Sequence, residues 1–393
     1  MSGSRRRRRG DPRPLGPDGV VLLARAIRGL EDILAAELRV RLGAKILDID
    51  HREVRFRAPL TEALFQVGTA DDLFIEVGTI DDVSHKRDAL TRLSEAVRGL
   101  PLARSLSLLR TMRVLGDAGS MEAIASFLGR RNYSRLEIED ATGRAIAREL
   151  DLRFRPHEPS AAPAEISWRV HIREDVAVVG LRLAAKPLHR RSYRTNSRTG
   201  SLHPPVAFAM AMLGDLQPGL RCLDPCCGAG TILIEARRSG VEVYALGTDI
   251  NGGVVAAARD NAIRAGVEVH WAVADAGQLP LRSRSIDRIV CNPPWGRAVR
   301  AAGRLELDPD AFGHEIARVL TADGIAVLLG PTDEQAGPFG MHVRWQTRIH
   351  VFGQWASLRV LTMRREDVRA PGDWAQSQIG ALLAGPVSSP TAR

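Results

Sequence analysis

The feature that most constrains the fold is a short stretch near the middle of the chain, Asp224 to Thr231, which reads Asp-Pro-Cys-Cys-Gly-Ala-Gly-Thr. An apolar run at 220–223 precedes it, and an apolar helical pattern at 232–236 follows it. A strand, a tight loop and a helix in this order set a small ligand against backbone N–H groups at the helix N-terminus. Glycines suit such a loop because a Cβ atom would hold the ligand away from the backbone. The stretch therefore predicts a ligand-binding loop in an α/β fold.

Two classes of ligand site share this arrangement of Gly228 and Gly230. A dinucleotide site also wants a third glycine three residues after the second, and Leu233 occupies that position. The Asp-Pro pair ahead of the glycines instead resembles the first motif of class I S-adenosylmethionine-dependent methyltransferases, in particular those that act on exocyclic amines of nucleic-acid bases. Taken alone, the motif leaves open a plain strand–turn–helix without a ligand.

Two carboxylates follow the next strand-like runs. Asp249 ends the run at 243–248, about 20 residues beyond the glycines, where a carboxylate can meet ribose hydroxyls. Asp275 follows the apolar run around 269–273. Their order after the glycine-rich loop favours a ligand site over an empty turn.

A proline-rich tetrapeptide, Asn292-Pro293-Pro294-Trp295, follows the strand-like run at 286–291. It resembles the catalytic Asn/Asp-Pro-Pro-aromatic motif of amino-methyltransferases that act on guanine N2 or adenine N6. An exocyclic amine is a poor nucleophile because its lone pair is delocalised into the ring. The Asn292 side-chain oxygen and a backbone carbonyl of the Pro-Pro segment can hold the amine protons in a preorganised site. The prolines fix the loop, and Trp295 offers a stacking face for an extruded base.

The resemblance implies a role for each motif residue. Asp224, Gly228 and Gly230 are expected at the methionine end of S-adenosylmethionine, Asp249 at the ribose hydroxyls and Asp275 at the adenine amine. The complete expected cofactor site is Asp224, Cys226, Gly228, Gly230, Thr231, Asp249, Ile250, Asp275, Ala276 and Asn292. The expected catalytic residues are Asn292, Pro293, Pro294 and Trp295, which hold a flipped guanine. This chemistry requires no metal and no covalent nucleophile.

The four cysteines are Cys222, Cys226, Cys227 and Cys291, and all of them fall beside the two motifs. Two are adjacent, and no paired Cys-x-x-Cys or histidine ligands accompany them. We therefore expect packing residues rather than a disulfide framework or a metal cluster. No apolar run approaches the roughly 20 residues of a membrane span, and the N-terminus lacks a secretory apolar stretch. These features predict a cytoplasmic protein without membrane or metal partners.

The net charge of +9 lies entirely in the first half of the chain. Residues 1–200 contain 36 lysines and arginines against 27 aspartates and glutamates, whereas residues 201–393 contain 19 of each kind. Five of the positive charges form the run at 5–9. A basic arm suits counterion release from a phosphate backbone. A solvated tail without a specific partner remains the alternative.

The front half resembles two further domains of one family. Residues 26–34 and 69–73 are similar to the N-terminal ferredoxin-like domain of the THUMP-containing RNA methyltransferases. Residues 187–194 match the closing segment of that family's front half. The segments that resemble a THUMP domain are 126–135, 137–150, 166–172 and 176–181. The segments that depart from the family pattern are 113–119 and 156–163.

These observations predict an α/β chain whose Rossmann-like class I methyltransferase domain has a mostly parallel seven-stranded sheet. Ferredoxin-like and THUMP-like α+β domains are expected ahead of it. The expected boundaries are a disordered basic tail at 1–19, a ferredoxin-like domain at 20–84, a THUMP-like domain at 85–185, a basic linker at 186–198, the methyltransferase domain at 199–365 and a tail at 366–393.

The linker is the expected RNA contact beside the catalytic pocket. No carboxylate occurs between residues 176 and 214, whereas basic residues crowd there. The expected RNA-binding residues are Lys186, Arg190, Arg191, Tyr193, Arg194 and Arg198, with Tyr193 as a stacking face. The alternative is a linker whose charges pair with acidic residues elsewhere.

The resemblance implies a monomeric S-adenosylmethionine-dependent enzyme that forms N2-methylguanosine in RNA, with tRNA as the expected substrate. An rRNA guanine-N2 methyltransferase shares the same parts. A DNA adenine-N6 enzyme shares the tetrapeptide but does not need a THUMP-like front half. A non-catalytic RNA-binding module that keeps the fold is an alternative of another class, and the intact Asp249 and Asn292 argue against it.

Overall fold

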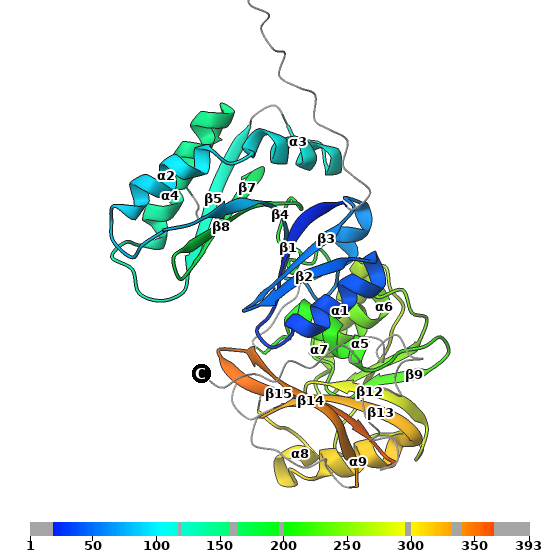
Figure 1. Ribbon diagram of the computed structural model, residues 1–393. Coiled ribbons are helices and arrows are strands. Elements are labelled where there is room, and N and C mark those ends of the chain that lie inside the picture. Colours follow the sequence, from blue (N-terminus) through cyan, green and yellow to red (C-terminus); the bar gives the residue numbers. More distant parts are fainter. Residues whose placement is uncertain are drawn as a thin grey trace, which may run out of the picture.

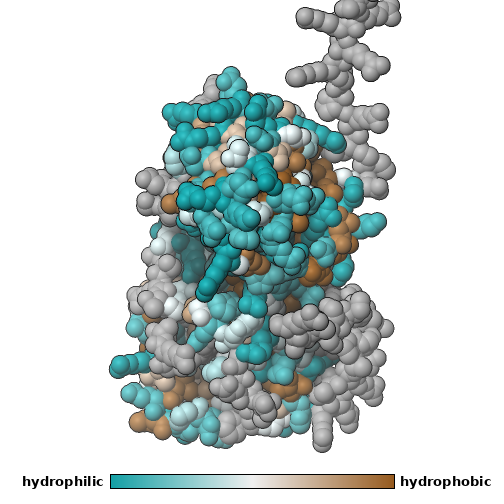
Figure 2. Space-filling model, turned by 60° about the vertical axis from the view of Figure 1, so that its left-hand side comes forward, coloured by the Kyte–Doolittle hydropathy of each residue, from teal (hydrophilic) through white to brown (hydrophobic). Residues whose placement is uncertain are grey.

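The computed structural model describes residues 19–116, 119–156, 164–195, 200–294, 300–331 and 340–364. An N-terminal part is built on an eight-stranded sheet, and a C-terminal part is built on a seven-stranded sheet (Figure 1). In the described part of the chain, none of the helices has both the length and the apolar character needed to cross a membrane. The view in Figure 2 shows a mainly hydrophilic surface over the N-terminal part, with scattered apolar side chains.

The N-terminal sheet has the strand order β2-β3-β1-β4-β8-β7-β5-β6. Its elements are β1 (Val20–Arg25), α1 (Glu31–Leu42), β2 (Lys45–Asp50), β3 (Glu53–Ala58), η1 (Glu62–Gln66), β4 (Asp72–Ile80), α2 (Ala89–Arg98), α3 (Leu102–Met112), β5 (Ser120–Phe127), α4 (Arg135–Leu150), β6 (Arg153–Phe154), β7 (Ile166–Arg173) and β8 (Val176–Arg182). Strands β4 and β8 pair antiparallel, so one sheet runs through the ranges expected as ferredoxin-like and THUMP-like domains. The boundary near residue 84 stays a prediction.

Local sequence explains several of these elements. Strand β4 is buried over most of its length and has an apolar centre, as a central strand requires. In β3 the buried Val54 and Phe56 flank the exposed Arg55, which gives the strand one core face. Helix α4 begins with a capping box, because Ser134 accepts from the N–H of Glu137 while Glu137 accepts from the N–H of Ser134.

The C-terminal sheet has the strand order β11-β10-β9-β12-β13-β15-β14. Its elements are α5 (Pro204–Leu213), β9 (Arg221–Asp224), α6 (Thr231–Arg238), β10 (Tyr244–Asp249), α7 (Gly252–Ala265), β11 (His270–Val273), β12 (Ile286–Cys291), α8 (Arg304–Leu307), α9 (Ala311–Val319), β13 (Leu320–Gly330), β14 (His342–Val351) and β15 (Gln354–Thr362). Strands β9, β10, β11, β12 and β13 are parallel to one another, and β15 runs antiparallel to both of its neighbours, β13 and β14. The predicted seven-stranded, mostly parallel sheet is confirmed.

Strand β9 lies between β10 and β12, so the connections leave it in opposite directions. Ligands of open α/β sheets bind at such a switch point, beyond the carboxyl ends of the strands. Helices α5 to α7 cover the sheet face toward the N-terminal part, and α8 and α9 cover the other face (Figure 1). The fold therefore predicts a ligand site at the loops after β9, β10 and β12.

The two parts share a hydrophobic core across their junction. Leu30 and Ile33, at the start of α1, pack in one cluster with Val206 and Met210 of α5. A Cβ atom added to Gly68 would lie 2.2 Å from the ring of Phe208, so backbone of the N-terminal part contacts the α5 side chain directly. The N-terminal part is thus packed against the helix layer beside the switch point.

A buried ion pair fastens the joining segment, residues 183–195, which follows β8 and connects the two parts. The Arg191 guanidinium donates to both carboxylate oxygens of Glu235 in α6, at 3.2 and 3.0 Å, and the two side chains are 7% and 1% exposed. Arg191 also donates to the carbonyls of Gly68 and Leu188, and the hydroxyl of Tyr193 donates to Glu235 at 2.8 Å. One carboxylate therefore ties α6, the joining segment and the N-terminal part together.

Arg191→Met tests how much the ion pair between Arg191 and Glu235 contributes to the stability of the protein. The change leaves the Glu235 carboxylate buried with the Tyr193 hydroxyl and the more distant guanidinium of Arg238, 3.7 Å away. Breaking a buried pair from one side costs about 3–5 kcal/mol. We expect that loss in the free energy of unfolding, measured by urea denaturation of the full chain.

The matched control is Arg92→Met, which removes an exposed pair between Arg92 of α2 and Asp88, the N-cap residue of that helix. Exposed pairs contribute less than about 1 kcal/mol, so this variant should unfold close to the wild type. Equal losses in the free energy of unfolding of the two variants would show that the buried Arg191 pair stabilises the protein no more than an exposed pair does.

Candidate active site

A cavity of about 430 Å³ opens at the carboxyl ends of β9, β10 and β12. Asp224 ends β9, Asp249 ends β10, and Asn292 directly follows β12. All three line the cavity, and Asp275 lines it from the loop after β11. The sequence motifs, which span about 70 residues, therefore meet at the switch point of the sheet.

The two glycines of the loop have different roles. Gly228 has a φ of +52°, and no atom lies within 4 Å of the position that a Cβ would occupy, so its backbone is open toward the cavity. Gly230 has a φ of +80°, and a Cβ there would lie 2.6 Å from the Trp271 ring and 3.1 Å from Ala258. Gly230 is not among the residues that line the cavity. The contact of Gly230 with the cofactor stays a prediction, and the lack of a side chain at Gly230 makes room for the indole of Trp271.

Asp224 is buried, and its carboxylate has little compensation. Burial raises the pKa of Asp224 to about 7; the N–H of Cys226, which donates at 3.2 Å, and the side chain of Cys291 oppose the rise, and the charge of Asp249 adds to it. A carboxylate in this position favours a nearby cation, because a positive charge would offset the lost hydration. The cavity thus presents a negative group at its β9 end.

Asp249 and Asp275 are held by backbone N–H groups. The two oxygens of Asp249 accept from Asn251 at 3.0 Å and from Gly228 at 3.1 Å. Those of Asp275 accept from Gly277 at 2.8 Å and from Arg304 at 2.7 Å, which places Asp275 against the start of α8. A carboxylate oxygen has two lone pairs, so each of these oxygens keeps capacity for a ligand donor.

The side-chain oxygen of Asn292 is the least satisfied polar atom of the site. It is buried, and it has no hydrogen-bond partner among the residues that the structure describes. Pro293 and Pro294 line the cavity beside it. Trp295, the fourth residue of the predicted catalytic motif, lies outside the described residues.

Most of the predicted cofactor residues line this one cavity. They are Asp224, Cys226, Gly228, Thr231, Asp249, Ile250, Asp275, Ala276 and Asn292. Ile250 and Ala276 give it apolar walls. All four cysteines are free; Cys226 and Cys227 line the cavity, and Cys222, Cys227 and Cys291 are buried.

Sequence reasoning missed the opposite wall. Ser201 and Leu202, just ahead of α5, line the cavity, and so do Phe352 and Gln354 around the β14–β15 turn. These residues lie far from the motifs in sequence, and only the fold brings them there. Asn251 also lines the cavity and accepts from the N–H groups of Gly253 and Val254. The Asn-Gly-Gly signal for a helix start could have identified it.

The linker is less available to RNA than its composition predicts. Lys186 and Arg190 are exposed, and Arg194 is half-buried and donates to the carbonyl of Ser201. Arg198 lies outside the described residues. The predicted RNA contacts of Arg191 and Tyr193 are corrected, because both side chains are buried on Glu235 and Tyr193 is only 1% exposed.

The two glycines give a matched pair of variants. Gly230→Ala places a Cβ in strained backbone and against Trp271, so we expect a loss of about 2–5 kcal/mol in the free energy of unfolding. Gly228→Ala has the backbone strain alone and should lose about 1–2 kcal/mol. Thermal or urea unfolding of both variants measures the difference. A larger loss for Gly228→Ala would contradict the packing role of Gly230.

The raised pKa of Asp224 predicts a pH dependence. The folded protein binds a proton at Asp224 below about pH 7, whereas the unfolded chain does so only below about pH 4. Stability therefore falls as pH rises through this window and levels off above it. Between pH 5 and 7 the wild type should lose about 2–3 kcal/mol more than Asp224→Asn. Urea unfolding of the ligand-free proteins at both pH values tests this, and parallel profiles would contradict it.

Comparison with known proteins relates this fold and site to characterised relatives. The family model described as RMKL-like, methyltransferase domain, matches residues 191–360. The tRNA (guanine(6)-N2)-methyltransferase of Thermus thermophilus is 29% identical over 306 residues, which are 76% of this chain and 86% of that protein. The U6 snRNA (guanine-N(2))-methyltransferase THUMPD2 of Bos taurus is 31% identical over 57% of this chain, and the match spans 41% of that protein.

Solved structures agree with the described architecture. The crystal structure of TrmN from Thermus thermophilus matches with a TM-score of 0.69 and 27% identity, covering 87% of this chain and 99% of that chain. The structure of SMU.472 in complex with SAH matches with a TM-score of 0.68 over 88% of this chain and 99% of that chain, and at 18% identity this likeness concerns the fold alone. The similarity to the RMKL-like methyltransferase domain covers residues 191–360, the part of this chain built on the seven-stranded sheet.

Proposed function

We propose that this chain is an S-adenosylmethionine-dependent RNA methyltransferase that forms N2-methylguanosine, with tRNA as its substrate. The observation that carries the proposal is the buried, unpartnered side-chain oxygen of Asn292 in the cavity. A buried acceptor without a donor costs about 1–3 kcal/mol. The exocyclic amine of a guanine is a donor that would satisfy it.

The cavity fits the proposed cofactor at several points. The open backbone at Gly228 allows close approach, and the Asp249 oxygens keep lone pairs for ribose hydroxyls. Ile250 and Ala276 offer apolar contact for an adenine ring, with Asp275 beside them. The desolvated carboxylate of Asp224 suits the ammonium group of the methionine end.

The chemistry depends on how the amine is held. Bound S-adenosylmethionine would supply a methyl carbon on a sulfonium. The guanine N2 lone pair would bond to that carbon as the carbon–sulfur electron pair returns to sulfur, and the methylated amine would release one proton to water. Asn292 accepts one amine N–H, which reduces delocalisation of the lone pair into the ring and orients it. Pro293 and Pro294 fix φ in the loop, so the acceptor is positioned before the base arrives.

The front half supports RNA as the substrate and tRNA as its class. All of the excess positive charge lies in residues 1–200. Similarity to the Thermus thermophilus tRNA enzyme extends over both sheets of this chain and over 86% of that protein. This chain spans about half the length, or less, of the snRNA relative and of the ribosomal RNA large subunit methyltransferase K/L of Photobacterium profundum, which it matches at 27% identity. The rRNA enzyme is the second candidate on that similarity.

Asn292→Ala tests the catalytic centre. The oxygen is proposed to act on the amine in the reactive geometry, so its loss should fall on the chemical step rather than on binding. We expect single-turnover transfer of labelled methyl to unmodified tRNA to slow about 100- to 1,000-fold. Cofactor affinity, measured by calorimetry, should stay near the wild-type value.

Asp249→Ala is the complementary variant, since it should weaken cofactor binding while the protein stays folded. Transfer by Asn292→Ala near the wild-type rate would remove the catalytic centre from the proposal. Digestion of the product to nucleosides and mass spectrometry identifies the base and the site methylated. Parallel reactions with unmodified rRNA separate the two RNA classes, because preferential methylation of rRNA would replace tRNA as the substrate.

A further inference from the structure

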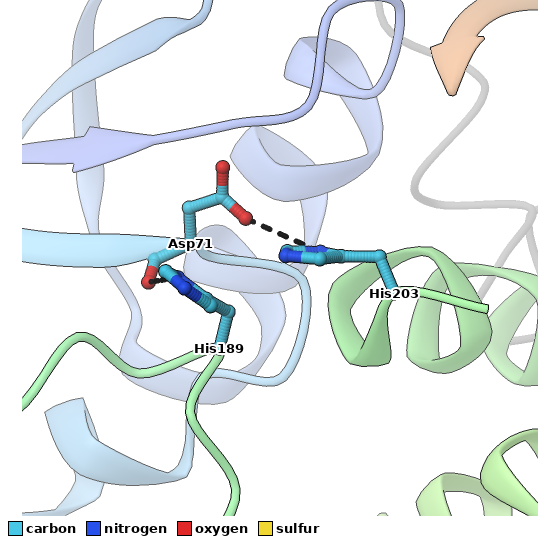
Figure 3. A group of neighbouring side chains, drawn as sticks. All are labelled: Asp71, His189 and His203. Atoms are coloured by element: carbon cyan, nitrogen blue, oxygen red, sulfur yellow. Dashed lines mark hydrogen bonds and ion pairs between the residues drawn. The ribbon is translucent and has the colours of Figure 1, made fainter. Parts of the chain in front are cut away.

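A second cluster of polar side chains lies at the junction of the two parts, one residue beyond the cavity wall. Asp71 precedes β4, His189 belongs to the joining segment, and His203 is the N-cap residue of α5. Their ligand atoms all lie within 4.8 Å of one another. Figure 3 shows the Asp71 carboxylate facing the His203 ring, with His189 against the main chain of Asp71.

From this geometry we propose that Asp71, His189 and His203 bind a divalent transition-metal ion that holds the N-terminal part to the methyltransferase domain. Two imidazoles and one carboxylate form a donor set typical of zinc and its first-row neighbours. The site is independent of the proposed methyl transfer. It was not expected from the sequence, because its residues lie in three distant segments.

The spacing of Asp71 and His203 suits shared coordination better than direct contact. The Asp71 Oδ1 and His203 Nδ1 atoms are 3.5 Å apart, which is too long for a good hydrogen bond. Both atoms are buried and have no hydrogen-bond partner among the described residues. Metal–ligand bonds of about 2.0–2.1 Å in a tetrahedral site separate two ligand atoms by about 3.3 Å. The observed gap therefore suits two ligands of one ion.

His189 is prepared for the same role by its own hydrogen bond. Its Nδ1 lies 3.2 Å from the main-chain carbonyl of Asp71, where a protonated Nδ1 donates. This tautomer leaves Nε2 as a free lone pair, and such a bond on the other nitrogen is the usual support of a metal-bound histidine. The rings of His189 and His203 are 5.0 Å apart between centroids. The three side chains fill three positions of a tetrahedral site, and the fourth position remains open for a water molecule.

The neighbouring charge defines how Asp71 would bind. Arg52 Nη2 lies 3.7 Å from the other carboxylate oxygen, Oδ2, so Oδ1 is the oxygen left for an ion. A guanidinium this close also repels a cation. Removing it should therefore preserve or strengthen metal binding, whereas removing a ligand should weaken it.

The test uses the full-length, untagged protein, freed of metal by a chelator and titrated with Zn²⁺ in a calorimeter. We expect one equivalent to bind. Asp71→Asn, His189→Gln and His203→Gln should each lower the affinity more than about tenfold, since even groups behind the ligands contribute 10- to 100-fold. Zn²⁺ at about a hundredfold excess over Kd should raise the unfolding midpoint of the wild type by a few degrees, and that of Asp71→Asn much less.

Two variants serve as controls. His270→Gln removes an exposed histidine of β11 and should bind Zn²⁺ like the wild type. Arg52→Gln removes the ion-pair partner of Asp71 but no ligand, and should bind Zn²⁺ as tightly or more tightly. The proposal is overturned if the wild type does not bind Zn²⁺ or if the three ligand variants bind it unchanged. It also fails if Arg52→Gln loses binding as Asp71→Asn does, because metal affinity would then report only the integrity of the junction.

Discussion

The arrangement of this molecule depends on a short chain of buried charges centred on the peptide unit at Gly68. The carboxylate of Glu37 in α1 accepts from the N–H groups of Gly68 and Thr69, at 2.7 and 2.8 Å. The guanidinium of Arg191 donates to the Gly68 carbonyl at 2.8 Å and then to Glu235 in α6. Burial raises the pKa of Glu37, so this carboxylate depends on its donors. A buried charge is tolerated only where such partners are complete, which fixes the geometry of the whole junction.

The same chain of contacts reaches the cavity through α6. Glu235 lies one turn beyond Thr231, the first residue of α6 and a residue of the cavity wall. On the other side of the helix start, Gly230 and Gly247 leave room for the Trp271 ring. The glycine-rich loop is therefore held from behind by packing and by an ion pair, while its Gly228 side stays open to a ligand. Preorganisation of this kind removes the cost of ordering the loop when a ligand binds.

Sequence reasoning worked where local chemistry is specific and failed where distant segments decide. The strand that ends at Asp224, the carboxylates at 249 and 275 and the Asn292 motif follow from the order of strands in a parallel sheet. Arg191 and Tyr193 look like RNA contacts because their partner, Glu235, lies 44 and 42 residues away and has no local signature. Helices α2, α3 and α7 and strand β5 were not predicted. For α7 the Asn251 cap and the spacing of Val255, Ala258 and Ala262 were sufficient, whereas the domain boundaries remain untested expectations.

The pairing of β4 with β8 also limits how the molecule can form. Phe74 lies opposite Arg182, so the first four strands complete their sheet only after more than half of the N-terminal part has followed them out of the ribosome. Closing so long a loop carries an entropic cost that local hairpins do not have, and it slows folding. During synthesis the β4 edge is exposed and offers unpaired backbone groups to other chains. The N-terminal part therefore has a period of vulnerability to aggregation that ends when β8 is added, before the catalytic half is made.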